Sequence, residues 1–153
     1  MKHALGVSLA LTLSFAACGG ETADTDAMPA AEMSSAAEEP IGTVTIVQPA
    51  EGAEVEGPAV TVQLEVSGFP LVEAGDMTEG TGHHHLYLDA DLTPASVPVP
   101  SVEGSIVHMG DGSASYTFEN VAPGEHRIIA VVADGAHFPL QPWVVDTVTF
   151  RVP

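Results

Sequence analysis

The sequence predicts an all-β domain: an antiparallel β-sandwich of about seven strands, of the immunoglobulin- or fibronectin-III-like class. Apolar and polar residues alternate in short segments, most cleanly in residues 60–66, which is typical of strands with one buried face. Gly- and Pro-rich turn signals separate these segments, and no stretch has the period of an amphipathic helix. The single cysteine, Cys18, excludes the disulfide of antibody domains. A cupredoxin-like Greek key is the alternative architecture.

Three segments carry the strongest strand arguments. Residues 106–109 and 113–118 flank a Gly-Asp-Gly turn, which predicts a hairpin. Residues 126–133 are the most apolar segment, which predicts a central strand. Residues 89–101 are rich in proline and predict a long connection or a sheet edge. The full set of expected strands is residues 42–48, 60–66, 83–89, 106–109, 113–118, 126–133 and 144–152.

The N-terminal part of the chain has the features of an export signal and a tether. Residues 1–17 combine a basic start with an apolar run and small residues, as in a secretory signal peptide. Cys18 directly after this run resembles the lipobox of bacterial lipoproteins, which implies cleavage before Cys18 and its lipidation; Gly19, in place of Asp, implies the outer membrane. Residues 18–40 are acidic and lack aromatic residues, which predicts a disordered tether before a folded domain at residues 41–153.

The charge balance narrows the possible partners. The chain contains 3 Lys and Arg against 21 Asp and Glu, and only Arg127 and Arg151 follow Cys18. Nucleic-acid binding requires a basic surface and is therefore excluded, and a membrane is expected to be contacted only through the N-terminal lipid. The acidic surface attracts cations, including metal ions.

The histidine-rich segment is the strongest candidate for a functional site. Alternation along a strand places His83, His85, Tyr87 and Asp89 on one face, and His84 on the core face with its leucine neighbours. His83 and His85 are then about 6.6 Å apart along the strand, so two imidazoles can converge on one ion. Imidazole is a common ligand of copper and zinc, which makes a copper or zinc site the leading hypothesis.

Further ligands must come from later segments. His126 or His108 is the expected third ligand, and His137 is a further candidate. Asp89 or Glu125 could bind the ion or orient a ligand ring. The competing interpretation is a structural one, in which the histidines hydrogen-bond to the backbone. His126, directly after a turn, would then act as a tyrosine corner does in other sandwiches.

Three stretches of the sequence resemble a family of uncharacterised exported bacterial domains, DUF4399. They are G-T-G-H-H-H-L-Y-L-D from Gly80, I-V-H-M-G-D-G from Ile106, and P-G-E-H-R followed by A-H-F-P. The resemblance extends from about Val60 to Val152; Tyr87 and Leu140 depart from the family pattern. It implies an exported β-domain with histidines at these positions, and it implies no activity.

These observations predict an envelope lipoprotein whose β-sandwich binds a transition metal. The alternative is a non-catalytic immunoglobulin-like interaction module, with an envelope protein or a glycan as its partner and with structural histidines. An enzyme is not expected, because the chain has neither a nucleophile-elbow serine nor a phosphate-binding glycine loop. A metal-dependent enzyme is a third, weaker reading.

Overall fold

The computed structural model describes residues 41–153. The expected signal peptide (1–17), lipidation site at Cys18 and acidic tether (18–40) lie outside the described residues. The regular structure of the described part consists of β-strands. No helix long and apolar enough to cross a bilayer is found among the described residues.

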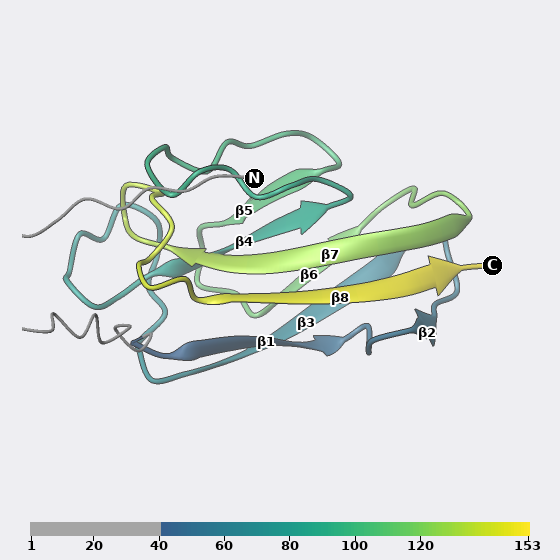
Figure 1. Cartoon of the computed structure of the whole chain (residues 1–153), viewed down its shortest axis with the longest axis horizontal. Helices are drawn as coiled ribbons and strands as arrows, with labels where there is room; N and C mark the ends of the chain where they lie inside the picture. Colours follow the sequence, from purple (N-terminus) through teal and green to yellow (C-terminus); the bar gives the residue numbers. More distant parts are fainter. Residues whose placement is uncertain (1–40) are drawn as a thin grey trace, which may run out of the picture. The chain divides into compact units, whose positions relative to one another are not determined.

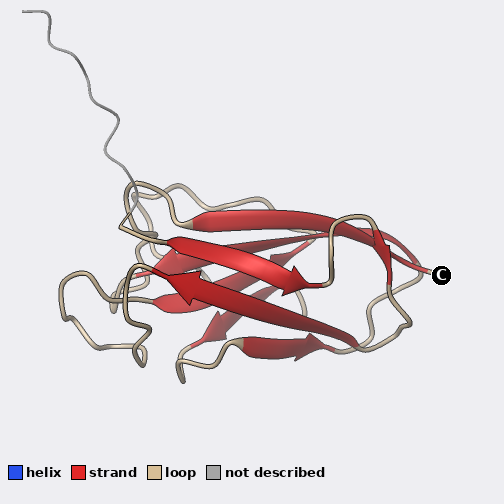
Figure 2. Cartoon of the chain, turned by 90° about the horizontal axis from the view of Figure 1, so that it is seen from below, coloured by secondary structure: helices blue, strands red, loops and turns tan. Residues whose placement is uncertain are grey.

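Two sheets face each other in the described domain (Figures 1 and 2). The smaller sheet has the strand order β1-β3-β6, and the larger has the order β2-β8-β7-β4-β5. Neighbouring strands are antiparallel except for the short pair β2 and β8, which is parallel. The strands are β1 (Thr43–Gln48), β2 (Ala53–Glu54), β3 (Val60–Ser67), β4 (His83–Leu88), β5 (Ile106–Met109), β6 (Ser115–Phe118), β7 (Gly124–Ala133) and β8 (Val145–Val152).

This arrangement confirms the predicted sandwich class. In immunoglobulin lettering, β1, β3 and β6 take the places of strands A, B and E, while β8, β7, β4 and β5 take those of G, F, C and C′. The most apolar segment is central, as expected, because β7 lies between β4 and β8.

The predicted hairpin between residues 106–109 and 113–118 is wrong. β5 pairs with β4 in the larger sheet, whereas β6 pairs with β3 in the smaller one, so the turn at Gly110–Gly112 crosses from one sheet to the other. The crossing buries Met109 and Phe118 in the same core from opposite sheets. A turn motif determines where the chain reverses, but the burial of these side chains determines the strand partner.

The core between the sheets follows the alternation of the sequence. On β1, Val44 and Ile46 point inward and their neighbours are exposed. On β4, His84 lies on the inner side with Leu86 and Leu88, as predicted, and all three are buried.

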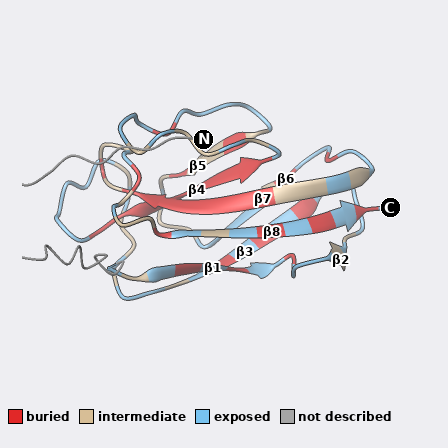
Figure 3. Cartoon of the chain, in the orientation of Figure 1, coloured by how far each residue is buried: buried red, intermediate tan, exposed pale blue. Residues whose placement is uncertain are grey.

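The outer face of β4 is also buried, which the sequence did not indicate. Tyr87 belongs to a second apolar cluster with Val99 and Ile129, against which Leu92 and Trp143 pack. These covering residues come from the connection after β4 and from the segment before β8. All six residues of β4 are therefore buried, and Figure 3 shows the strand red along its length.

Burial on both faces makes consecutive residues of β4 equally important for stability. We expect Leu86→Ala and Tyr87→Ala each to lower the free energy of unfolding by about 3 kcal/mol or more, because each leaves a cavity in a separate core. Thr45→Ala, at an exposed site on β1, should change it by less than about 0.5 kcal/mol. Urea unfolding in the presence of a chelator measures all three. A loss for Tyr87→Ala as small as that for Thr45→Ala would contradict the burial of the outer face.

Candidate metal centre

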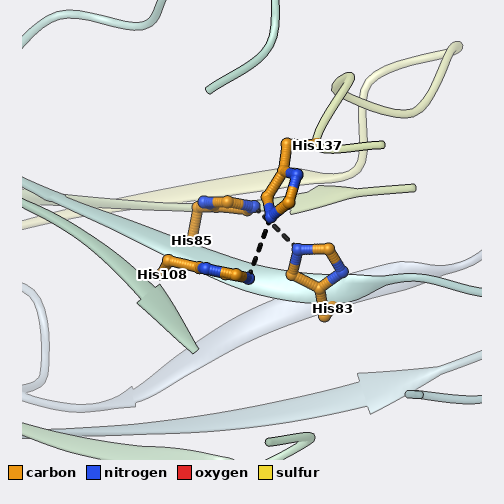
Figure 4. A group of neighbouring side chains, drawn as sticks. All are labelled: His83, His85, His108 and His137. Atoms are coloured by element: carbon orange, nitrogen blue, oxygen red, sulfur yellow. Dashed lines mark hydrogen bonds between the residues drawn. The ribbon is translucent and has the colours of Figure 1, made fainter. Parts of the chain in front are cut away.

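Four histidines from three segments meet on the outer side of the larger sheet (Figure 4). His83 and His85 lie at the start of β4 and point to the same side because they are two residues apart. His108 reaches them from β5, where it is the register partner of His85. His137 comes from the loop between β7 and β8.

The four rings turn their ligand nitrogens toward one another. The Nε2 atoms of His83 and His85 are 3.1 Å apart, and those of His108 and His137 are 3.2 Å apart. One nitrogen from each ring lies within 4.8 Å of the others. A tetrahedral ion with Zn–N bonds of about 2.0–2.1 Å separates its ligands by about 3.3–3.4 Å. The cluster could therefore hold one metal ion after ring movements of about an ångström.

The loop at residues 134–138 places His137. The Asp134 carboxylate accepts hydrogen bonds from the backbone N–H groups of Ala136 and Phe138, both at 2.9 Å. The Asp134 carbonyl accepts another from His137 N–H. His137 has φ = 69°, in the left-handed region that few residues other than glycine adopt. The partly buried Asp134 carboxylate thus holds the loop in which a strained residue, His137, turns its ring to the cluster.

The segment of residues 71–82 packs against the turn that follows His108 and against the loop that carries His137. Ala74 N–H donates to the Gly110 carbonyl, and a Cβ atom at Gly110 would lie 2.7 Å from His108 Nε2. A Cβ at Gly135 would lie 2.1 Å from the Asp76 carbonyl oxygen. Glycine is therefore required at both positions, because the segment and the His108 ring occupy the space of a side chain. Sequence reasoning treated this segment only as a connection.

Burial keeps the inner histidines neutral. His83 and His85 are fully buried, while His108 and His137 are partly exposed. Burial, with repulsion from neighbouring imidazoles, lowers the pKa of His83 to about 4 and that of His85 to about 2. Burial and the nearby His137 also lower the pKa of His108. Neutral imidazoles have a lone pair free to bind a metal ion.

His84 and His126 are framework histidines, by which we mean histidines whose rings hydrogen-bond to backbone carbonyl groups. His84 Nδ1 donates to the Ser113 carbonyl at 3.1 Å inside the core. His126 Nε2 donates to the Ala122 carbonyl at 2.7 Å, four residues upstream, in the manner of a tyrosine corner. The rings of the four clustered histidines, by contrast, make no hydrogen bond to a backbone carbonyl of the described residues.

The structure does not bring His126 to the cluster. It lies near the opposite end of β7, about 20 Å away along the strand. Its second nitrogen, Nδ1, donates to the Asp89 carboxylate at 2.7 Å. Asp89 therefore orients His126 and no cluster ring, and Glu125 lies at the same distant end of β7. The other two candidates for further ligands, His108 and His137, do lie at the cluster, because strand order brings β5 and the 134–138 loop beside the start of β4.

Both ring nitrogens of His126 face oxygen acceptors, so both bonds exist only when the imidazole is protonated. Partial burial alone would lower the pKa of His126, but the hydrogen bonds to Asp89 and Ala122 and the Asp89 charge outweigh burial and raise it.

The comparisons with known proteins identify a family and a set of distant structures. The model of a domain of unknown function, DUF4399, matches residues 62–153, which confirms the resemblance read from the histidine motifs. No curated protein matches the chain. The fibronectin(III)-like modules of Clostridium thermocellum CbhA match at 14% identity with a TM-score of 0.45, covering 72% of this chain and 96% of theirs. An engineered protein matches at 14% identity with a TM-score of 0.39, covering 73% of this chain and 20% of its own.

The Asp89–His126 pair predicts a pH-dependent contribution to stability. A pKa raised by folding stabilises the domain below the unfolded pKa of about 6.5, and this contribution is lost as the pH rises through the folded pKa. Asp89→Asn should therefore lower the free energy of unfolding more at pH 5.5 than at pH 8. The difference should be about 1 kcal/mol or less, because Asp89 is half exposed.

Urea unfolding at both pH values and an NMR titration of the His126 ring measure these effects. Asp91→Asn is the matched control, because Asp91 pairs with Arg127 and contacts no histidine. Equal losses for Asp89→Asn at the two pH values, with an unchanged His126 pKa, would contradict the assignment.

Proposed function

We propose that this chain, which belongs to the DUF4399 family, binds one transition-metal ion through His83, His85, His108 and His137. The observation that carries the proposal is the orientation of the four rings. Their nitrogens converge on one another, whereas the two framework histidines, His84 and His126, bond to carbonyl groups. The acidic surface would favour the approach of a cation.

The ligand set favours copper or zinc. Four imidazoles suit both ions, and the usual affinity order of divalent ions places copper above zinc. Met109, beside His108, is buried in the core on the other face of β5 and therefore supplies no soft ligand. Comparing the affinities of the protein for Cu(II) and Zn(II) would show which of the two ions it prefers.

A site with four protein ligands is suited to holding an ion. Catalytic zinc sites keep one position for water or substrate, whereas closed four-ligand sites do not. His108 and His137 are partly exposed, so the ion would enter and leave on their side of the cluster. Combined with the signal-like N-terminus and Cys18, this favours a lipid-anchored envelope protein that scavenges, delivers or senses metal.

One observation favours the rival function, an interaction module with structural histidines. Nitrogen separations of 3.1 and 3.2 Å also fit two N–H···N hydrogen bonds, which would join the rings in pairs without an ion. In that arrangement the buried Nδ1 atoms of His83 and His85 remain without partners among the described residues. A metal titration separates the two functions.

We expect tag-free protein to bind one Cu(II) or Zn(II) per chain with a sub-micromolar Kd in calorimetry. His85→Gln should weaken binding at least a hundredfold, because it removes a central ligand. His126→Gln is the matched control: it removes a histidine outside the cluster and should leave the Kd within about threefold. Binding that is equally weak in the parent protein and both variants would contradict the metal-binding function and favour the interaction module.

The buried histidines also predict how binding depends on pH. Free imidazole takes up a proton near pH 6.5, but the pKa of His83 is about 4 and that of His85 about 2. Protons therefore compete with the metal at these two ligands only in strongly acidic solution. We expect the affinity to fall far less from pH 7.5 to pH 5.5 than it would with four exposed imidazoles, each of which would cost about tenfold, and to fall steeply toward pH 4. A hundredfold fall already at pH 6 would indicate solvent-exposed ligands.

A further inference from the structure

A second candidate site lies at the other end of the larger sheet, away from the histidine cluster. It is a cleft of about 710 Å³ over β2, β7 and β8. Arg127 and Arg151 both line it, and they are the only Lys or Arg side chains after Cys18. A volume of this size is typical of small-molecule sites.

Strand register arranges the charges of this cleft. Arg151 of β8 is the register partner of Glu54 on β2 and of Glu125 on β7, so a cation stands between two carboxylates on neighbouring strands. All three side chains line the cleft and are exposed, yet none forms an ion pair within 4.0 Å in the described part of the chain. These three groups are therefore available to a ligand.

Two further charged side chains of the cleft, Arg127 and Asp89, have partners within the domain. Arg127 Nη2 donates to the Ala90 carbonyl and to the Asp91 carboxylate. Asp89 accepts from His126 with one carboxylate oxygen and from Arg127 N–H with the other. These bonds engage Arg127 and Asp89 within the domain, whereas Arg151, Glu125 and Glu54 have no such partners in the described part of the chain.

We propose that this cleft binds a small zwitterion that carries an ammonium and a carboxylate group, such as an amino acid or a short peptide. The carboxylate would pair with Arg151, and the ammonium with Glu125 or Glu54. A simple anion is disfavoured by the large acid excess of the chain. A simple cation would find carboxylates over the whole surface. Only a ligand with both charges matches the arrangement that distinguishes this cleft, an arginine between two glutamates.

This site is independent of the proposed metal function. His126 at the cleft and the metal-facing end of β7 are about 20 Å apart along the strand. The cleft uses no residue of the histidine cluster. Failure of one proposal therefore leaves the other unaffected.

The test is an NMR titration of the ¹⁵N-labelled protein with glycylglycine. Two matched probes each carry one charge: N-acetylglycylglycine has the carboxylate alone, and glycylglycinamide has the ammonium alone. We expect saturable shifts of the amides at residues 125–127 and 149–151 with glycylglycine, and at least tenfold weaker binding of either single-charge probe. Arg151→Gln and the double change Glu54→Gln/Glu125→Gln should each weaken glycylglycine binding at least tenfold. Glu103→Gln, which removes an exposed acid outside the cleft, should leave it unchanged.

Three results would overturn the proposal. The absence of saturable shifts would show that the cleft takes no such ligand. Equal binding of N-acetylglycylglycine would reduce it to a simple anion site. Equal binding of glycylglycinamide would reduce it to the general attraction of cations by an acidic surface. The same spectra report whether each variant is folded, and the three-probe comparison on the parent protein decides the question without any variant.

Discussion

The burial of β4 on both faces is the constraint on which the rest of the domain depends. Its inner face contributes Leu86 and Leu88 to the core between the sheets, and its outer face contributes Tyr87 to a second apolar cluster. The covering segments are therefore part of the fold, because without them an apolar sheet face would meet water. His83 and His85 lie on the same buried strand, and their burial is the largest cause of their lowered pKa values.

The two ends of the larger sheet use histidine in opposite ways. At the start of β4, burial and the neighbouring imidazoles lower the pKa of His83, His85 and His108. At the start of β7, Asp89 and a carbonyl group surround His126 with acceptors, so the protonated ring is the stable one. The buried histidines at one end are thus neutral, whereas His126 at the other end is a candidate cation, and the difference comes from burial and from the neighbouring groups.

Local sequence patterns predicted much of this structure. They failed where the structure depends on pairing between strands that are distant in the sequence. Local patterns located every strand except the two-residue β2, as well as the two faces of β4, and the motif at His83–His85 located half of the cluster. The partner of β5 could not be read from its turn, since pairing with β4 depends on burial across the sandwich. For the same reason, spacing along the chain could not choose between His108, His126 and His137: their proximity follows from strand order and from the 134–138 loop. The cleft with both arginines was missed because its charges lie on three strands that are distant in sequence.

The cluster joins three segments that no covalent bond connects. His85 and His108 are 23 residues apart, and His108 and His137 are 29 apart. An ion bound to all of them would close two loops and so restrict the unfolded chain, as a disulfide does in many secreted domains. A sandwich whose folded part contains no cysteine would then have a cross-link that chelation or acid can open and that does not depend on the redox state of its surroundings. Such a domain would resist proteolysis better when metal is available to form the cross-link than when it is absent.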